Sequence, residues 1–201
     1  MSAKKYNIIY ADPPWSYKDK LRCGQRGSSF KYPTLTAKSI KELPVSNLAA
    51  ENCVLFLWIT PPLYPLGLEV MKAWGFEYKT LAFTWVKWNK KANSPFFGLG
   101  HGTRANAEFV LRGTRGKLER KDKAVSQIIF NDFLGFDVDL DTEVIVTQVG
   151  AHSAKPQGAR EGIERLYGDV PRIELFARER VEGWDATGLD FDGVDIRDLL
   201  I

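Results

Sequence analysis

The stretch that most constrains this chain is Asp12-Pro13-Pro14-Trp15, which directly follows the apolar run Asn7-Ile8-Ile9-Tyr10-Ala11. A short, continuous apolar run predicts a strand buried on both faces, as in a parallel sheet. The two prolines end that strand because they have no N–H to donate and fix φ. The acid is thereby placed at the carboxyl edge of a predicted sheet, where open α/β sheets bind ligands. An ordinary strand-ending turn is the alternative explanation for the two prolines alone.

The length and composition fit one globular domain. We expect a single domain over residues 1–201, with an acidic tail over about 182–201 that packs loosely. The net charge of +3 and the pI near 8.8 fit an anionic partner but do not require one. Cys23 and Cys53 form no CxxC pair and only two histidines are present, so we expect no metal site.

The sequence gives no sign of a membrane segment. The first residues lack a following apolar signal region, and no stretch approaches the ~20 apolar residues that a spanning helix needs. We therefore expect a soluble, cytoplasmic protein. No pattern indicates the oligomeric state, and a monomer and a homodimer both remain open.

Apolar runs alternate with helical patterns along the whole chain. This alternation predicts a three-layer α/β domain with a mostly parallel sheet. Strands are expected over residues 7–11, 54–59, 81–88, 107–112, 144–146 and 172–177. Helices are expected over residues 37–43, 66–74 and 156–167.

Asp12 is the first candidate for chemistry. Its carboxylate and the carbonyl of Pro13 offer two acceptors close together, which suits an exocyclic amino group with two N–H donors. Holding both donors orients the nitrogen lone pair toward an electrophile and disperses the positive charge that develops on alkylation. Trp15 could stack on a flat base, or could simply belong to the core.

Further charged residues stand at the predicted ends of other elements. Lys87 ends an aromatic strand and could bind an anionic group, with a solvated strand-end lysine as the alternative. His152 and Lys155 precede a predicted helix, whose N-terminus favours anions. Glu174 lies near the end of the last strand, where an acid can accept hydrogen bonds from a ribose diol. A glycine-rich dinucleotide fingerprint and a Walker A lysine motif are both missing from the sequence.

Three basic segments could contact phosphates. They span residues 16–31, 89–104, which includes Arg104, and 112–123. Lysine and arginine side chains supply most of the sequence-independent affinity for nucleic acid.

With these residues in place, the chain resembles the MT-A70 family of adenine-N6 methyltransferases from Ile8 to about Gly188. Besides Asp12-Pro13-Pro14-Trp15, the resemblance rests on segments in the family's order along the chain. They are Val54 to Thr60, Trp85-Val86-Lys87, Gly100 to Gly113, His152-Ser153-Ala154-Lys155-Pro156 and Ile173 to Arg178. The order is similar to the permuted, beta-type arrangement of amino-methyltransferases, with the acidic motif first. The turn at residues 177–180 departs from the glycine-rich turn common in that arrangement.

The resemblance implies a Rossmann-like fold, S-adenosylmethionine as methyl donor and the N6 amine of adenine as acceptor. It assigns the catalytic motif to Asp12, Pro13, Pro14 and Trp15. It assigns cofactor binding to Asp12, Lys87, His152, Lys155, Glu174, Phe176 and Arg178. For substrate binding, we expect Trp15, Tyr32, Lys87 and Arg104.

The resemblance leaves the nucleic acid open, since the family includes RNA and DNA enzymes. The chain is close to a bare catalytic domain and is similar to small stand-alone members, so we expect DNA as substrate. An RNA adenine methyltransferase and a catalytically silent nucleic-acid-binding subunit are the alternatives. The intact acidic motif argues against the silent subunit.

Overall fold

In the computed structural model, the described residues are 4–16, 34–89, 94–96, 98, 102–130, 145–146, 155–188, 193 and 196–199. Their strands form one eight-stranded sheet in the order β10-β9-β1-β2-β6-β3-β7-β8. The strands are β1 (Tyr6–Ala11), β2 (Ala49–Ile59), β3 (Glu77–Val86), β6 (Ala107–Arg115), β7 (Ile128–Phe130), β8 (Ile145–Val146), β9 (Arg172–Leu175) and β10 (Asp185–Thr187). A separate hairpin pairs β4 (Trp88–Asn89) with β5 (Ser94–Pro95).

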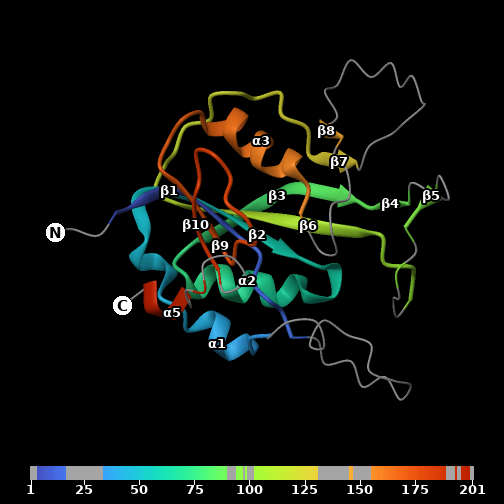
Figure 1. The fold of residues 1–201 in the computed structure, drawn as a ribbon, viewed down its shortest axis with the longest axis horizontal. Helices are drawn as coiled ribbons and strands as arrows, with labels where there is room; N and C mark the ends of the chain where they lie inside the picture. Colours follow the sequence, from blue (N-terminus) through green and yellow to red (C-terminus); the bar gives the residue numbers. More distant parts are fainter. Residues whose placement is uncertain are drawn as a thin grey trace.

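Helices cover both faces of this sheet (Figure 1). One face carries α3 (Gln157–Tyr167), and the other carries α1 (Ala37–Lys41), α2 (Tyr64–Ala73) and α5 (Ile196–Leu199). Two short 3-10 turns, η2 (Val45–Asn47) and η3 (Pro61–Leu63), flank β2. Each face has its own apolar cluster of buried side chains. The predicted three-layer, Rossmann-like α/β architecture is confirmed.

The sheet is mostly parallel, as the sequence predicts. Five of its seven strand pairings are parallel, and the two antiparallel pairings both involve β6. β1 lies between β2 and β9, with Tyr10 opposite Phe56 on one side and Glu174 on the other. Because β2 is buried throughout its second half, its sequence is a run of apolar residues without alternation.

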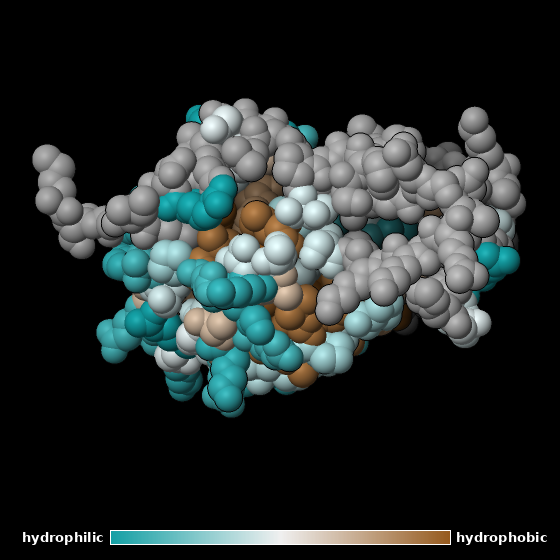
Figure 2. Space-filling view, turned by 90° about the horizontal axis from the view of Figure 1, so that it is seen from below, coloured by the Kyte–Doolittle hydropathy of each residue, from teal (hydrophilic) through white to brown (hydrophobic). Residues whose placement is uncertain are grey.

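Figure 2 shows the molecule from below, on the side of the sheet that α1 and α2 cover. Hydrophilic side chains gather over one part of the described surface, and apolar surface is visible between them. Val70 and Met71 of α2 are fully buried against the sheet, while Lys72 points its charge outward at the last turn. Within the described part of the chain, the helices are too short or too polar to cross a membrane.

The expectation that the tail from residue 182 packs loosely is wrong for its first residues. Trp184 is buried, and β10 adds a parallel strand to the edge of the sheet beside β9. The Trp184 indole packs near Tyr10, with 5.8 Å between ring centroids, and its Nε1 donates to Glu164 at 2.6 Å. Burial of this aromatic ring outweighs the acidic composition around it.

Candidate active site

Four charged side chains meet where the central strands end. Asp12 follows β1, Lys87 follows β3, Lys155 precedes α3, and Glu108 is the second residue of β6. Because β6 runs antiparallel to β2 and β3, its amino end lies beside their carboxyl ends. The reversed strand therefore brings Glu108 to the same sheet edge as Asp12.

These side chains form a network of ion pairs in which acidic and basic groups alternate. Lys155 Nζ lies 2.8 Å from Asp12 Oδ2 and 3.1 Å from Glu108 Oε2. Lys87 Nζ donates to Glu108 Oε1 at 2.5 Å. The side chains of Asp12, Glu108 and Lys155 are 13–19% exposed, so water screens these pairs only partly. Two cations facing two anions make the site balanced in charge.

The pKa values show how the charge is distributed. Burial raises the pKa of Asp12 above its usual value, and Lys155 opposes that rise. Burial alone would raise the pKa of Glu108, but Lys155 and Lys87 outweigh it and hold that pKa below its usual value. Burial also opposes the charge on Lys155, yet the two carboxylates raise its pKa well above normal. Lys155 is thus the cation that favours the ionised form of Asp12 against the effect of burial.

The residues after Asp12 form a rigid scaffold. Trp15 N donates to the Pro13 carbonyl at 2.8 Å, and Leu35 N donates to the Pro14 carbonyl at 2.9 Å. Since a carbonyl oxygen has two lone pairs, that of Pro13 keeps one for a further donor. Both acceptors that the sequence analysis assigns to an amino group are present, at a fixed turn.

Trp15 belongs to the core rather than to the surface of the site. Its side chain is 6% exposed, and its indole Nε1 donates to the backbone carbonyl of Trp58 at 3.0 Å. Of the two alternatives, the packing around the ring agrees with a core position, and the stacking of Trp15 on a base stays a prediction. Its role is to anchor the turn that carries Asp12 and the two prolines.

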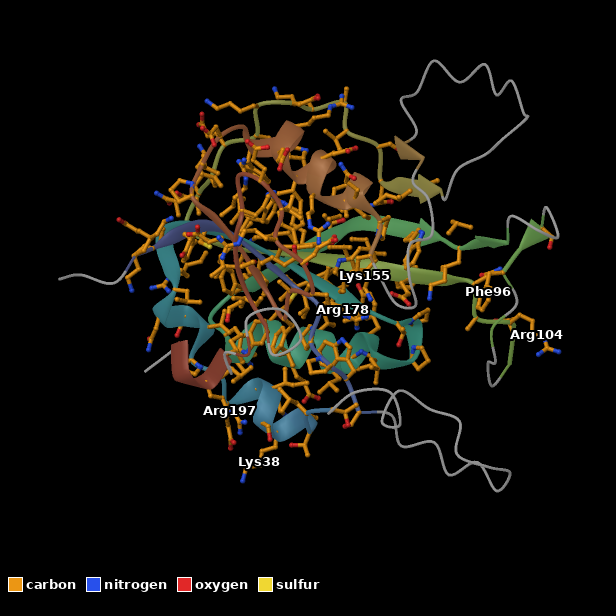
Figure 3. The ribbon with its side chains drawn as sticks, in the orientation of Figure 1. Lys38, Phe96, Arg104, Lys155, Arg178 and Arg197 are labelled. Carbon is orange, nitrogen blue, oxygen red and sulfur yellow. The ribbon has the colours of Figure 1, made fainter. Side chains whose placement is uncertain are left out.

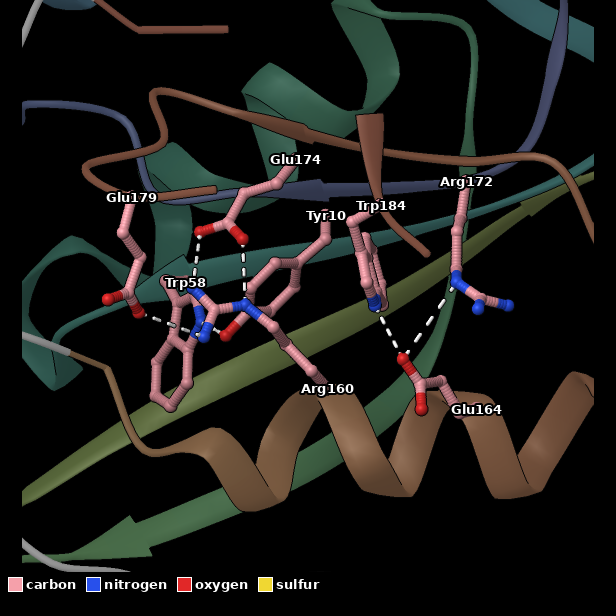
Figure 4. A network of polar contacts seen from close by, with 8 residues as sticks. All are labelled: Tyr10, Trp58, Arg160, Glu164, Arg172, Glu174, Glu179 and Trp184. Atoms are coloured by element: carbon pink, nitrogen blue, oxygen red, sulfur yellow. Dashed lines mark hydrogen bonds and ion pairs between the residues drawn. The ribbon is translucent and has the colours of Figure 1, made fainter. Parts of the chain in front are cut away.

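A second polar group is built around Arg160 of α3 and Glu174 of β9 (Figure 4). Arg160 of α3 donates from Nε to Glu174 Oε2 at 2.8 Å and from Nη2 to Glu174 Oε1 at 3.0 Å. Burial raises the pKa of Glu174, and Arg160 opposes that rise. The charge of Arg178 acts to lower the pKa of Asp12, so this group and the Asp12 group share one electrostatic environment.

The chain turns sharply after β9. Phe176 has φ of 63°, in the left-handed region that favours glycine, and its ring packs partly buried against the α1–α2 core. Ala177 N then donates to the carbonyl of Thr187 at 2.9 Å. A non-glycine residue in this conformation costs roughly 1–3 kcal/mol and is typical of functional turns. Phe176 directly precedes residues 177–180, which contain no glycine.

The remaining predicted residues lie apart from this centre or outside the described residues. Tyr32 and His152 lie outside the described residues. Arg104 is exposed, near the β4–β5 hairpin and far from Lys155 and Arg178 (Figure 3). A substrate-binding role for Arg104 stays a prediction, and its exposed position suits a contact with nucleic acid away from Lys155.

The basic run over residues 112–123 lies away from the Asp12 edge of the sheet, and its contact with phosphates stays a prediction. It begins at the far end of β6 from Glu108, where Arg115 donates to the carbonyl of Ser46 at 3.1 Å. Lys121 N donates to the carbonyl of Leu166, at the end of α3 that lies away from Lys155. This run does not border the carboxyl edge that carries Asp12.

Sequence reasoning missed two residues of the site, Glu108 and Arg160. Glu108 lies in the segment Gly100 to Gly113 but received no role there, and Arg160 lies outside the quoted segments. Each acquires its place from a contact between distant elements. The signal for Glu108 was an acid at the start of an otherwise apolar strand, but its position depends on the reversed direction of β6. The signal for Arg160 was a cation on the apolar face of α3, one turn after Pro156.

Comparison with known proteins identifies the family to which the chain belongs. Residues 6–190 match the family model described as MT-A70. The chain belongs to the MT-A70 family. Its members are methyltransferases that use S-adenosylmethionine to methylate N6 of adenine. Among the described residues, His, Cys, Asp and Glu form no cluster that could hold a metal ion.

Two kinds of relative match almost the whole chain. The chain is 34% identical over 205 residues to type II methyltransferase M.MunI of a Mycoplasma species, covering 93% of this chain and 78% of that protein. It is 30% identical over 197 residues to the human N(6)-adenosine-methyltransferase catalytic subunit METTL3. That match covers 96% of this chain and 30% of METTL3, so the chain spans less than a third of the human protein.

The residues present fit the methyl donor of MT-A70 enzymes. Glu174 supplies a buried carboxylate near the end of β9, beside Asp12 at the end of β1. An acid at that place on an α/β sheet suits a ribose diol, and the flanking cations Lys155 and Lys87 suit an amino-acid carboxylate. When bound, S-adenosylmethionine supplies an electrophilic methyl group.

Proposed function

We propose that this MT-A70 protein methylates N6 of adenine in DNA, with Asp12 and Pro13 orienting the amine. The observation that carries the proposal is the Asp12–Lys155 pair, which holds an ionised carboxylate beside the Pro13 carbonyl at the sheet edge.

The two acceptors act on the two N–H bonds of the amine. One N–H donates to the Asp12 carboxylate and the other to the Pro13 carbonyl, which directs the nitrogen lone pair away from both. As the N–C bond forms and the methyl group leaves its sulfur, positive charge develops on nitrogen, and Asp12 stabilises it. The raised pKa of Asp12 suits it to accept the surplus proton afterwards.

In duplex DNA a stacked base cannot present N6 to this edge. The target adenine therefore has to be flipped out of the helix, at a cost of roughly a few kcal/mol. Cationic segments outside the pocket, such as the exposed Arg104, are suited to contact the phosphates that hold the flipped strand. The site itself is neutral overall, and phosphate binding is left to such segments.

The match to relatives supports DNA over RNA. The chain accounts for 78% of the type II methyltransferase but only 30% of METTL3, so its similarity to the first extends over most of that protein. We therefore propose that it acts as a type II enzyme does, on adenine in DNA.

The test is to incubate the protein with labelled S-adenosylmethionine and matched DNA and RNA oligonucleotides of mixed sequence. We expect label in the N6-methyladenine of DNA and at least roughly tenfold less in RNA, a discrimination of about 1.4 kcal/mol. Greater labelling of RNA than of DNA would instead support an RNA adenine methyltransferase. Label in neither, from a folded protein that binds no cofactor by calorimetry, would instead support a silent nucleic-acid-binding subunit.

Exchanging Lys155 for methionine is expected to move the acid limb of the pH–kcat profile to higher pH by at least about one pH unit. Asp12 acts as the ionised carboxylate, and burial already raises its pKa. Removing the adjacent cation raises that pKa further, so a higher pH is needed to ionise it. The measurement is kcat across pH at saturating cofactor.

The matched control for this prediction is Lys41→Met. Lys41 pairs with Glu69 at 3.0 Å on the surface, and its loss should leave the profile unchanged. An acid limb that stays in place in the Lys155→Met protein would show that Lys155 does not set the ionisation of Asp12.

A further inference from the structure

Arg160 holds Glu174 by two parallel hydrogen bonds, one to each carboxylate oxygen. The two side chains are 8% and 9% exposed, so the pair is almost completely removed from water. A two-point contact of this kind fixes the plane of the carboxylate as well as its charge. Glu174 therefore cannot rotate about its last bond without breaking one of the two contacts.

The contact leaves acceptor capacity on Glu174. An ionised carboxylate has about four lone-pair sites, and Arg160 uses one on each oxygen. One site on each oxygen remains, on the sides turned away from the guanidinium. These two sites point to opposite sides of the carboxylate, so one of them can accept a single ribose hydroxyl, as an acid at this strand end does for a 2′-hydroxyl.

Arg160 is itself fixed from other directions. Its guanidinium lies 5.9 Å from the ring centroid of Tyr10, and its Nη1 is 3.5 Å from Glu179 Oε1. The Tyr10 hydroxyl in turn accepts a hydrogen bond from Trp58 Nε1 at 2.6 Å. These contacts tie the arginine to β1 and β2, the strands whose ends carry the Asp12 scaffold (Figure 4).

We propose that Arg160 is a positioning residue for the cofactor, holding the Glu174 carboxylate so that one remaining acceptor site receives the ribose 2′-hydroxyl of S-adenosylmethionine. This inference rests on the proposed cofactor role of Glu174. It adds a residue within α3 to the proposed cofactor-binding residues, which otherwise lie at strand ends or, as Lys155 does, just before α3. It also explains why a cation is buried on the apolar face of α3.

The test compares binding of S-adenosylhomocysteine and its 2′-deoxyribose form by calorimetry. The wild-type protein should bind the ribose form more tightly. Arg160→Met should weaken binding of the ribose form roughly tenfold, as loss of a residue that orients a ligand-binding group does. Binding of the deoxyribose form should change much less, so the preference between the two ligands shrinks.

Arg160→Lys keeps the charge but not the two-point contact, and it should restore only part of the preference. It carries the same test if Arg160→Met does not fold. The matched control is Arg165→Met, which removes another arginine of α3, paired with Asp122 at 2.8 Å away from Glu174. This control should leave both affinities unchanged.

Equal weakening of both ligands by Arg160→Met would show a merely structural role and overturn the inference. Equal binding of the ribose and deoxyribose ligands by the wild-type protein would overturn it as well. Glu174 would then not receive the 2′-hydroxyl. Both results are independent of DNA methylation. A failure of the proposed substrate would appear only in the oligonucleotide assay.

Discussion

Asp12→Ala is expected to lower kcat for adenine-N6 methylation by at least roughly 100-fold, the range seen when a group that stabilises developing charge is removed. The carboxylate is the acceptor that orients the amine and the anion nearest to the positive charge that develops on it. Lys155 still has Glu108 as a partner at 3.1 Å, so no buried cation is left alone. The fold and the affinity for S-adenosylmethionine should therefore change little.

The measurement is single-turnover methylation at saturating cofactor, with cofactor affinity determined separately by calorimetry. Asp12→Asn serves as the isosteric comparison, since the amide keeps the shape but loses the charge. Asp122→Ala is the matched control, because Asp122 pairs with Arg165 at the opposite end of α3 from Lys155. Near-normal methylation by Asp12→Ala would rule out the assigned chemistry.

Trp58→Ala is expected to reduce the free energy of unfolding by about 3–5 kcal/mol, a large part of the roughly 5–15 kcal/mol that holds a domain together. Trp58 is fully buried near the end of β2. Its indole lies edge-on to Trp85 with 6.0 Å between ring centroids, and its Nε1 donates to the Tyr10 hydroxyl. Truncation opens a cavity and leaves that hydroxyl without its donor.

The midpoint of urea unfolding, with the slope compared between variants, measures this loss. Phe96→Ala is the control, since Phe96 is 44% exposed and its removal should change stability by less than about 0.5 kcal/mol. A decrease of less than about 1 kcal/mol in the free energy of unfolding of Trp58→Ala would mean that Trp58 contributes little to the stability of the core beneath the site.

The fold follows from local patterns that the sequence displays openly. The apolar runs at residues 7–11 and 54–59 lie in β1 and β2, and the amphipathic pattern at residues 156–167 forms α3. Their ends shift by a few residues because pairing partners decide where a strand stops. β2 begins at Ala49 since its amino half pairs alongside β1 from Tyr6 onward, although that half is partly exposed and less apolar.

The site was only partly predictable, because it depends on contacts between distant elements. Asp12, Lys155 and Glu174 stand in motifs at strand or helix ends, and the structure brings the first two into direct contact. The place of Glu108 follows from the reversed direction of β6, which no local pattern encodes. The packing of the tail was predicted wrongly because the prediction relied on its acidic composition. Trp184 within it packs its ring beside Tyr10.

The most direct test of the account is to determine which atom of DNA receives the methyl group. Mixed-sequence duplex DNA is incubated with the protein and S-adenosylmethionine, digested to nucleosides and separated by mass spectrometry against standards. The geometry of Asp12 and Pro13 predicts N6-methyldeoxyadenosine, with none formed by Asp12→Ala. Methyl groups on a ring nitrogen of adenine or on cytosine would contradict the account, because a paired acceptor site then would not be selecting an exocyclic adenine amine.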